Sequence, residues 1–375
     1  MILTETQQAI RDAVREFAQD RIKPHSAAFE EARGYPSALF EQLAALGVMG
    51  MTAPEEVGGA GADYVSYALA LMEIAAADGA LSTIVSIQNS LIVASVLKDG
   101  TPEQQQRFLS DLIAGRMIGA FALTEADAGS DAAALRMRAQ KVDGGYRLSG
   151  SKQFITSAKI AGIAIVYAVT DPAAGKRGIT GFIVPTVSAG YRVDKVEHKL
   201  GQQASDTCAI RFDDVFVEDG LRLGAEGAGY AIALANLAMG RIGIAAQCIG
   251  MAQAAFDIAV AYAKERRSFG KAIIGHQAVG FRLADLATRL EAARQLVLHA
   301  AASKDAGLPS LQEASMAKLF ASETAEAVVS GAIQTLGGYG YLEEFGVAKI
   351  YRDVRVCQIY EGTSDIQRIV IARAL

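Results

Sequence analysis

The C-terminal part of the chain contains three long segments with the 3.6-residue periodicity of α-helices and few helix-breaking residues, at residues 230–263, 276–306 and 311–336. Short breaks separate them, which predicts an antiparallel bundle of three or four helices. Residues 230–263 form the most apolar stretch of the sequence, but polar side chains such as Asn236 and Gln247 interrupt it. A buried core helix therefore explains this stretch better than a membrane span does.

The two parts that precede this bundle differ from each other in residue pattern. Residues 1–118 show helical periodicity, beginning with Thr4 as a helix cap. Residues 119–223 contain short runs of β-branched and aromatic residues, with a hairpin signal at Asp143-Gly144. The sequence thus predicts an α+β fold with three domains: an N-terminal α-helical domain at 1–118, a middle antiparallel β-barrel or sandwich at 119–223, and a C-terminal helical bundle at 224–375.

Composition and charge exclude several classes of function. The 375-residue chain is 51% hydrophobic, lacks Trp and carries a net charge of −5, which argues against binding to nucleic acid or to an anionic membrane surface. The three cysteines (Cys208, Cys248 and Cys357) and four histidines do not have the spacing of metal ligands or of a disulfide framework. The N-terminus enters an acidic amphipathic helix without the features of a signal or transit peptide, so we expect a cytoplasmic, reducing environment and no metal.

One carboxylate near the C-terminus lies between an apolar run and the predicted start of a helix. Glu361 follows an apolar and aromatic run and precedes Gly362, after which Thr363, Ser364 and Asp365 have the pattern of a helix cap and first turn. A carboxylate at such a joint can be desolvated, which raises its pKa and suits it to act as a general base. On this stretch alone, an exposed acid in a capped turn is the simpler interpretation.

Four further loops interrupt regular elements, at residues 121–131 (FALTEADAGSD), 154–156 (FIT), 266–270 (RRSFG) and 334–340 (QTLGGYG). The first and last are rich in glycine, where backbone N–H groups can approach a phosphate or a heterocycle. The second offers an aromatic ring beside a hydroxyl, and the third offers cations at a helix break, with Gln277 nearby. Each also has a purely structural explanation as a junction turn, a buried strand or a helix C-cap. None is a G-x-G-x-x-G after a strand, so a Rossmann domain is not indicated.

Taken together and in order, these loops, with Met239-Gly240-Arg241 and Ile359 to Ser364, resemble the acyl-CoA dehydrogenases over almost the whole chain. The resemblance implies an N-terminal helical domain, a middle β domain and a C-terminal four-helix bundle, usually in a homotetramer. It also implies noncovalent FAD, with the isoalloxazine between the middle and C-terminal domains and part of the FAD tail on a neighbouring subunit.

By position, the resemblance assigns three groups of cofactor residues and one group of substrate residues. Phe121, Leu123, Thr124, Gly129, Ser130, Phe154, Ile155 and Thr156 hold the flavin from the β side; Arg266, Phe269, Gln277, Gln334, Leu336, Gly337 and Gly338 hold the rest of FAD, largely across a dimer interface; and Thr363, Ser364 and Asp365 meet FAD at a helix N-terminus. Ser130, Ala238, Met239, Arg241, Gln247, Tyr360 and Gly362 match positions that contact acyl-CoA.

The resemblance also implies a reaction. Glu361 removes the α-proton of the thioester, and the Glu361 backbone N–H with a ribityl hydroxyl of FAD holds the developing enolate oxygen. The β-hydride passes to flavin N5, which gives a trans-2-enoyl-CoA, and electron-transfer flavoprotein is the usual acceptor. The alternatives are an acyl-CoA oxidase, which reduces oxygen, and a catalytically silent scaffold that binds acyl-CoA.

Individual positions narrow the substrate. Isovaleryl-type relatives carry a glutamate where this chain has Gly240, and glutaryl-type relatives carry an arginine near Ser82, where no cation stands here. Gln247 matches short-chain and short-branched-chain members, and Tyr360 narrows the cavity further. We therefore expect a short straight or methyl-branched acyl group. Ala238 departs from the aspartate often found in short-chain members, which removes a polar contact to the CoA chain.

Overall fold

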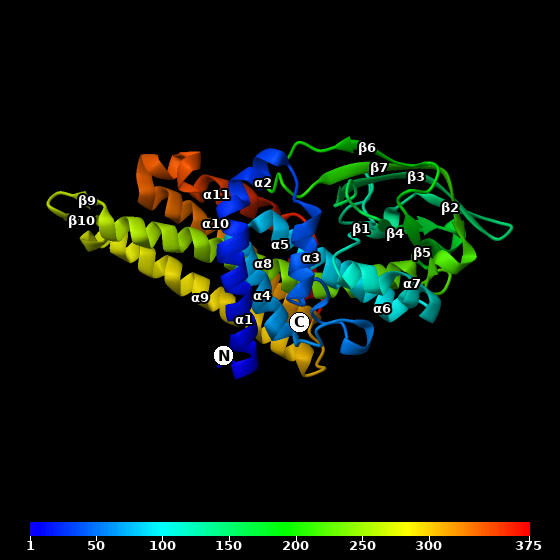
Figure 1. The fold of residues 1–375 in the computed structure, drawn as a ribbon, viewed down its shortest axis with the longest axis horizontal. Helices are drawn as coiled ribbons and strands as arrows, with labels where there is room; N and C mark the ends of the chain where they lie inside the picture. Colours follow the sequence, from blue (N-terminus) through cyan, green and yellow to red (C-terminus); the bar gives the residue numbers. More distant parts are fainter.

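The computed structural model describes all residues from 1 to 375 and has helices at its centre and at one end, with a β sheet at the other end (Figure 1). The helical N-terminal part contains α1 (Glu5–Phe17), α2 (Ser26–Ala32), α3 (Ser37–Ala45), α4 (Tyr64–Ala77), α5 (Gly79–Ile87), α6 (Ala94–Asp99) and α7 (Pro102–Ile113). Thr4 caps α1 with a complete capping box, as its position before the first amphipathic segment predicts.

Helices α4 and α5 meet at Asp78, which ends the first helix and caps the second. The Asp78 carboxylate accepts a hydrogen bond from the Leu81 backbone N–H, at 2.9 Å. A π-helical stretch, Gln88–Val93, then joins α5 to α6, so that helix continues from Gly79 to Asp99. This long helix was expected from the sequence only between residues 81 and 97.

The middle part is an eight-stranded sheet in the order β6-β7-β3-β2-β4-β5-β8, with β1 paired to β4. Its strands are β1 (Gly119–Ala122), β2 (Arg138–Val142), β3 (Gly145–Thr156), β4 (Ile163–Val169), β5 (Ile179–Pro185), β6 (Tyr191–Val196), β7 (Thr207–Glu218) and β8 (Arg222–Leu223). Most pairs are antiparallel, as predicted, and β2 and β3 form the predicted hairpin. The sheet as a whole is mixed, because β4 runs parallel to both β1 and β2.

A β-bulge in β3 falls on the predicted cofactor segment at residues 154–156. The register against β7 shifts between Lys152 and Ile155, and Phe154 within the bulge has a left-handed backbone with φ of +59°. A bulge bends the strand and redirects the side chains within it. Phe154 is accordingly 62% exposed, while Ile155 beside it is buried in the sheet core.

The C-terminal part consists of three long helices, two shorter ones and a small hairpin. These are α8 (Gly229–Glu265), β9 (Arg267–Ser268), β10 (Lys271–Ala272), α9 (Gln277–Asp305), α10 (Leu311–Leu336), α11 (Val347–Val354) and α12 (Ser364–Ala372). The three long helices agree closely with the three periodic segments of the sequence. The hairpin of β9 and β10 lies at the tip of α8 and α9, at the end of the molecule opposite the sheet (Figure 1).

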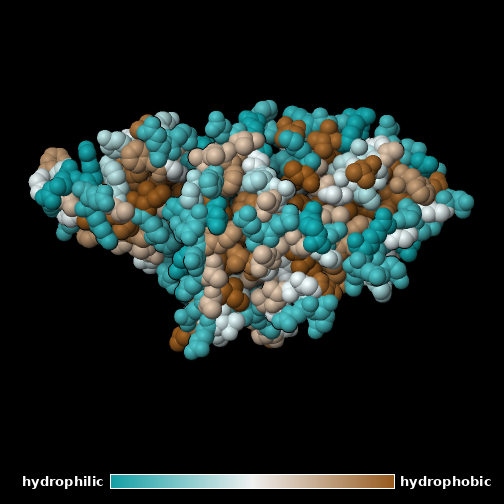
Figure 2. All heavy atoms as spheres, in the orientation of Figure 1, coloured by the Kyte–Doolittle hydropathy of each residue, from teal (hydrophilic) through white to brown (hydrophobic).

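Two hydrophobic cores hold these parts together. One joins α4 to the long C-terminal helices, and the other joins the sheet to the helix from Gly79 to Asp99, to α7 and to the first turns of α8. Two helices, Gly79–Asp99 and Gly229–Glu265, are long and apolar enough to cross a membrane, but 89% and 72% of their apolar windows are buried inside the protein. They are therefore core helices. The face of the molecule seen in Figure 2 is mostly hydrophilic with scattered apolar patches.

Candidate active site

Glu361 lies in a turn between a short 3₁₀ segment, Arg355–Gln358, and α12. Its backbone is left-handed, with φ of +50°, and Gly362 follows with φ of +91°. Thr363 then caps α12 by accepting a hydrogen bond from the Ile366 backbone N–H, at 3.3 Å. A non-glycine residue with positive φ is uncommon and needs support from its surroundings.

The Glu361 carboxylate is enclosed against α8. Both of its oxygens are buried, and neither has a hydrogen-bond partner in the protein. Gly240 makes this position possible, because a Cβ atom at residue 240 would lie 2.1 Å from Glu361 Oε2. Burial raises the pKa of the Glu361 carboxyl to about 7, while the positive charges of Lys318 and Arg241 act in the opposite direction. A carboxylate with free lone pairs and this pKa can accept a proton at neutral pH.

A buried lysine of α10 and an amide of α12 support the turn, and Arg241 of α8 adds a second buried cation nearby. Lys318 Nζ donates to the Gly362 carbonyl at 2.8 Å, and Gln367 Nε2 donates to the same oxygen at 2.9 Å. Arg241 Nη1 donates to Ser315 Oγ at 3.1 Å. Burial lowers the pKa of the Lys318 ammonium, although nearby Cys248, Cys357 and Glu361 act against this shift. Arg241 and Gly362 were predicted from the sequence, whereas Lys318 and Gln367 were not. The sequence shows Lys318 and Gln367 only as single polar residues on otherwise apolar helix faces.

The predicted substrate residues Gln247 and Tyr360 contact each other. The Tyr360 hydroxyl donates to Gln247 Oε1 at 2.7 Å, and Gln247 Nε2 donates to Thr83 Oγ1 and to the Gly79 carbonyl, each at 2.6 Å. Their polar groups are therefore paired within the protein. Thr83, which the sequence did not single out, belongs to the same cluster. Among the other predicted substrate residues, Met239 accepts a hydrogen bond from the Tyr64 hydroxyl at 3.0 Å and Ala238 is half-buried on α8.

On the sheet side, the two predicted flavin segments are joined by a buried ion pair. Lys152 is fully buried; its Nζ lies 2.8 Å from Glu125 Oε1 and donates to the Leu123 carbonyl at 3.0 Å. Burial lowers the pKa of Lys152 to about 8, although Glu125 opposes that shift. Lys152 in β3 and Glu125 in the loop after β1 thus hold residues 121–130 beside residues 154–156. Lys152 was not predicted to belong to the site, and Glu125 was included only as a member of the 121–131 loop.

Within these segments, the residues differ in what they can present to a ligand. Leu123 and Ile155 direct their side chains into the sheet core, so only their backbone atoms are available. Phe121 is half-buried and packs against Tyr167, with ring centroids 5.2 Å apart. Exposed positions are Phe154, Gly129 and Ser130, while Thr124 and Thr156 are half-buried.

The second group of predicted cofactor residues surrounds a hollow of about 470 Å³ at the other end of the molecule. Its lining includes Arg266, Leu336, Gly337, Gly338 and Tyr339. The Arg266 guanidinium carbon lies 6.0 Å from the centre of the Tyr339 ring, and a Cβ atom on Gly337 or Gly338 would meet open space. Gln334 and Gln277 lie nearby, at the end of α10 and the start of α9, and Phe269 in the hairpin is 97% exposed.

These two groups are far apart within one chain. The sheet segments and the β9–β10 hairpin lie at opposite ends of the molecule (Figure 1). The third group is at the start of α12, where Ser364 is half-buried with an unpartnered Oγ and Asp365 is exposed and paired with Arg368 at 3.3 Å. The sheet group and the hairpin group of one chain therefore cannot form a single compact site.

Comparison with known proteins identifies the family and the fold. Family models of the acyl-CoA dehydrogenase N-terminal, middle and C-terminal domains match residues 4–116, 120–215 and 227–375. The chain belongs to the acyl-CoA dehydrogenase family. An acyl-CoA dehydrogenase of Bacillus subtilis is 46% identical over 100% of this chain and 99% of its own length, and the mitochondrial short-chain specific enzyme of Bos taurus is 43% identical over 99% and 90%.

Solved structures agree with this acyl-CoA dehydrogenase over its full length. Butyryl-CoA dehydrogenase from Megasphaera elsdenii has a TM-score of 0.97 and 40% identity, covering 100% of this chain and 99% of that one. A chain solved in work on the electron transferring flavoprotein of Acidaminococcus fermentans has a TM-score of 0.98 and 41% identity, covering 100% and 98%.

The protein is therefore a flavin-dependent oxidoreductase, and FAD is its cofactor. The residues present fit that group, because the exposed Phe154 face and the open glycine-lined hollow beside Arg266 both leave room for a flat, anionic ligand.

Proposed function

We propose that this acyl-CoA dehydrogenase oxidises short straight or methyl-branched acyl-CoA thioesters to trans-2-enoyl-CoA, with Glu361 as the base that removes the α-proton. The observation that carries the proposal is the enclosed Glu361 carboxylate, which has no hydrogen-bond partner and a pKa raised to about 7 by burial. An ordinary structural carboxylate at this depth would be paired. An unpaired one suits proton transfer, because its lone pairs are free for a substrate proton.

The surrounding residues have complementary roles. Lys318 and Arg241 place positive charge near the carboxylate, which limits how far burial raises its pKa. No acceptor in the chain takes the Glu361 backbone N–H, so this donor is available for the carbonyl oxygen of a thioester. FAD, when bound, supplies the acceptor for the β-hydride. Phe154 and the residue 121–130 loop, held together by Lys152 and Glu125, orient that group from the sheet side.

A short acyl group fits the polar cluster on the floor next to Glu361. Gln247, Thr83 and Tyr360 are hydrogen-bonded to one another and to Gly79, so as the end of an acyl site they would be rigid and not flexible. No cation stands in this cluster to receive a distal carboxylate. The likeness to butyryl-CoA dehydrogenase and to the short-chain enzyme supports the same length, whereas a preference for methyl branches stays a proposal from the sequence.

The proposal extends to assembly and partners. The hairpin group of cofactor residues lies far from the sheet group of the same chain. In a homotetramer, this hairpin group would contact the FAD bound by a neighbouring subunit. We propose electron-transfer flavoprotein as the acceptor, in a cytoplasmic setting, supported by the likeness to the chain from the Acidaminococcus fermentans work.

Anaerobic reduction of the bound flavin by a panel of acyl-CoA thioesters tests the proposal. We expect rapid bleaching by butyryl-CoA and 2-methylbutyryl-CoA, and slow bleaching by octanoyl-CoA and glutaryl-CoA. No bleaching by any thioester would leave the silent-scaffold alternative standing. Fast reoxidation of the product-bound enzyme in air would instead indicate an acyl-CoA oxidase.

A further inference from the structure

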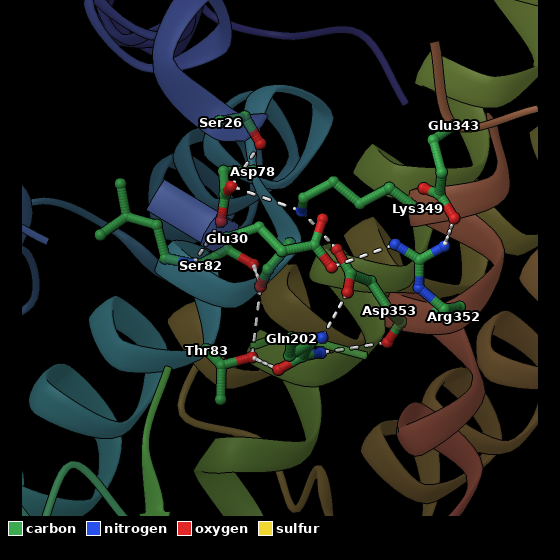
Figure 3. Close-up of polar contacts among 12 residues, drawn as sticks. Ser26, Glu30, Asp78, Ser82, Thr83, Gln202, Glu343, Lys349, Arg352 and Asp353 are labelled. Carbon is green, nitrogen blue, oxygen red and sulfur yellow. Dashed lines mark hydrogen bonds and ion pairs between the residues drawn. The ribbon is translucent and has the colours of Figure 1, made fainter. Parts of the chain in front are cut away.

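A buried triad of two acids and one lysine joins the N-terminal part of the chain to α11 (Figure 3). Lys349 Nζ lies 2.6 Å from Asp353 Oδ2 and 3.5 Å from Asp78 Oδ2. The side chains of Asp78, Asp353 and Lys349 are 0%, 2% and 14% exposed. Buried charges are retained only when they are paired and hydrogen-bonded, and Asp78 also accepts hydrogen bonds from the hydroxyls of Ser26 and Tyr35.

The middle part of the chain enters the same cluster through Gln202. Its backbone N–H donates to Asp353 Oδ1, and its side-chain amide donates to the Asp353 carbonyl at 3.2 Å. Gln202 has a left-handed backbone with φ of +51°, and Gly201 before it lies so close to α11 that a Cβ atom would be 2.3 Å from the Arg352 backbone. The loop between β6 and β7 is thus fitted against α11 at one fixed place.

From Gln202 the hydrogen bonds continue to the residue before the proposed base. Gln202 Oε1 accepts from Thr83 Oγ1 at 2.8 Å, and Gln202 Nε2 lies 3.4 Å from the Tyr360 hydroxyl. A second route runs from Asp78 through its neighbour Gly79, whose carbonyl accepts from Gln247, and Gln247 accepts from Tyr360. The two routes close a ring of polar contacts that starts at the triad and ends at the Tyr360 hydroxyl.

The ring and the pair Lys318 and Gln367 hold different residues of the turn. Those two residues hold Gly362, the residue after Glu361, whereas the ring holds Tyr360, the residue before it. Because Glu361 itself has a left-handed backbone and makes no side-chain hydrogen bond, its direction depends on these two neighbours. The carboxylate itself is not fixed by any hydrogen bond, and Gln367 Nε2 also donates to the Glu361 backbone carbonyl, at 3.4 Å.

We propose that Lys349 is a positioning residue for Glu361. Lys349 holds Asp353, and Asp353 holds Gln202. Gln202, together with Gln247 and Thr83, fixes Tyr360 and hence the backbone that directs the Glu361 carboxylate. This inference rests on the proposed role of Glu361. It gives the buried triad a function in the reaction beyond stability. Misplacement of a catalytic group by about 1 Å can slow a reaction by about 100-fold.

The test compares Lys349→Met, Lys349→Arg and Tyr360→Phe in the FAD-loaded enzyme. We expect Lys349→Met to slow anaerobic flavin reduction by butyryl-CoA at least about tenfold, with FAD content and crotonyl-CoA affinity unchanged, and Lys349→Arg to recover most of the rate. Arg107→Met is the control, because its pair with Glu218, at 2.9 Å, also joins a helix to the sheet but is exposed. Equal rates for Lys349→Met and Arg107→Met overturn the proposal.

A double-mutant cycle separates positioning from general loosening. If Lys349 acts through Tyr360, the double variant Lys349→Met/Tyr360→Phe is no slower than the slower single variant, whereas multiplied effects show independent roles and overturn the proposal. The pH midpoint of the rate also falls in Lys349→Met, because a loosened turn admits water to Glu361, while Lys318 and Arg241, which face it, are unchanged.

Asp353→Asn replaces Lys349→Met in this cycle if the latter does not fold, and additive effects with Tyr360→Phe overturn the proposal in the same way. If the wild-type flavin is not bleached by any thioester, it is the proposed function that fails, before any variant is compared.

Discussion

Two sets of buried carboxylates in this protein have opposite surroundings. Asp78 and Asp353 share Lys349 and accept hydrogen bonds from several hydroxyl and backbone donors. Glu361 is also enclosed, yet both of its oxygens are without a partner. Burial raises the pKa of Glu361 to about 7; it also raises the pKa of Asp353, but there Lys349 holds the shift back. The paired acids stabilise the junction of three domains, whereas the unpaired acid is left free to exchange a proton.

This contrast separates structural carboxylates from reactive ones by their partners and not by their depth. An acid that accepts several hydrogen bonds has its lone pairs occupied and its charge balanced. Glu361 packs against Gly240, and Lys318 and Arg241 lie nearby without hydrogen bonds to its carboxylate. Its lone pairs therefore remain available.

Removal of the unpaired charge should stop the reaction. We expect Glu361→Gln to slow flavin reduction by butyryl-CoA by about 100-fold to 10,000-fold, because the amide cannot accept the α-proton. FAD content and crotonyl-CoA binding should not change. Asp257→Asn, which alters an exposed acid on α8, is the matched control and should react at the wild-type rate. A Glu361→Gln enzyme with near-normal bleaching would place the base elsewhere.

Filling the space beside the carboxylate should have the next largest effect. In Gly240→Ala, the new Cβ atom meets Glu361 Oε2 at 2.1 Å, so the carboxylate has to move. We expect flavin reduction to slow by about 100-fold while the protein still folds and binds FAD. Gly34→Ala is the control, because a Cβ there meets no atom within 4 Å. Equal rates for the two variants would show that the space beside the Glu361 carboxylate does not limit the reaction.

The unpaired acid should also lower stability at high pH. Burial raises the pKa of Glu361 from 4.5 to about 7, so the folded state resists ionisation. Stability from this group is complete below pH 4.5 and is lost as the pH rises through 7, where the difference is on the order of 3 kcal/mol. We expect Glu361→Gln to unfold at a higher temperature than wild type at pH 8, with the gap closing at pH 4.5. A gap that does not depend on pH would contradict the burial argument.

Removal of a neighbouring cation should make Glu361 harder to ionise. Because the base acts when ionised, the wild-type rate should rise with pH through about 7. Lys318 opposes the raised pKa of Glu361, so Lys318→Met should move the midpoint of this rate profile upward by about one pH unit, which lowers the rate at pH 7 about fivefold. Lys318→Arg keeps the charge and should return the midpoint toward the wild-type value. A downward shift in Lys318→Met would reverse the assigned role.

The smallest effect concerns the helix cap that follows the turn. Thr363→Ala removes the acceptor for the Ile366 backbone N–H and should lower the free energy of unfolding by about 1 kcal/mol. Thr363→Ser keeps the hydroxyl and should be close to wild type. Urea unfolding of both variants measures the difference. A large loss of flavin reduction in Thr363→Ala, without a change in FAD content, would show that the cap also positions Glu361.

Much of the architecture could be predicted from local pattern. The long C-terminal helices, the β2–β3 hairpin and the cap at Thr363 follow from periodicity and turn residues, which act over a few positions. The parallel pairing of β1 with β4 could not be predicted in this way, because it depends on which strands meet after the chain has folded. The bulge that exposes Phe154 is likewise a property of the β3–β7 pair.

The site was predictable only in part, for the same reason. Glu361 was singled out by the family resemblance, because its position before a capped helix alone favoured an exposed acid, and Gln247 was singled out by its likeness to short-chain relatives. Lys318, Lys152 and Thr83 did not stand out, because a single polar residue in an apolar segment has no local meaning until its partner is known. The closeness of Gly240 to Glu361 joins residues more than a hundred positions apart.

By itself, the sequence determined that this chain has helical, β and helical parts in that order, and the family resemblance marked Glu361 as the candidate base. The tertiary structure alone decided that this acid is unpaired while Asp78 and Asp353 are saturated. The physical reason is that hydrogen-bond partners and desolvation are set by atoms brought together from distant segments. Local sequence specifies the group, and the folded environment specifies its reactivity.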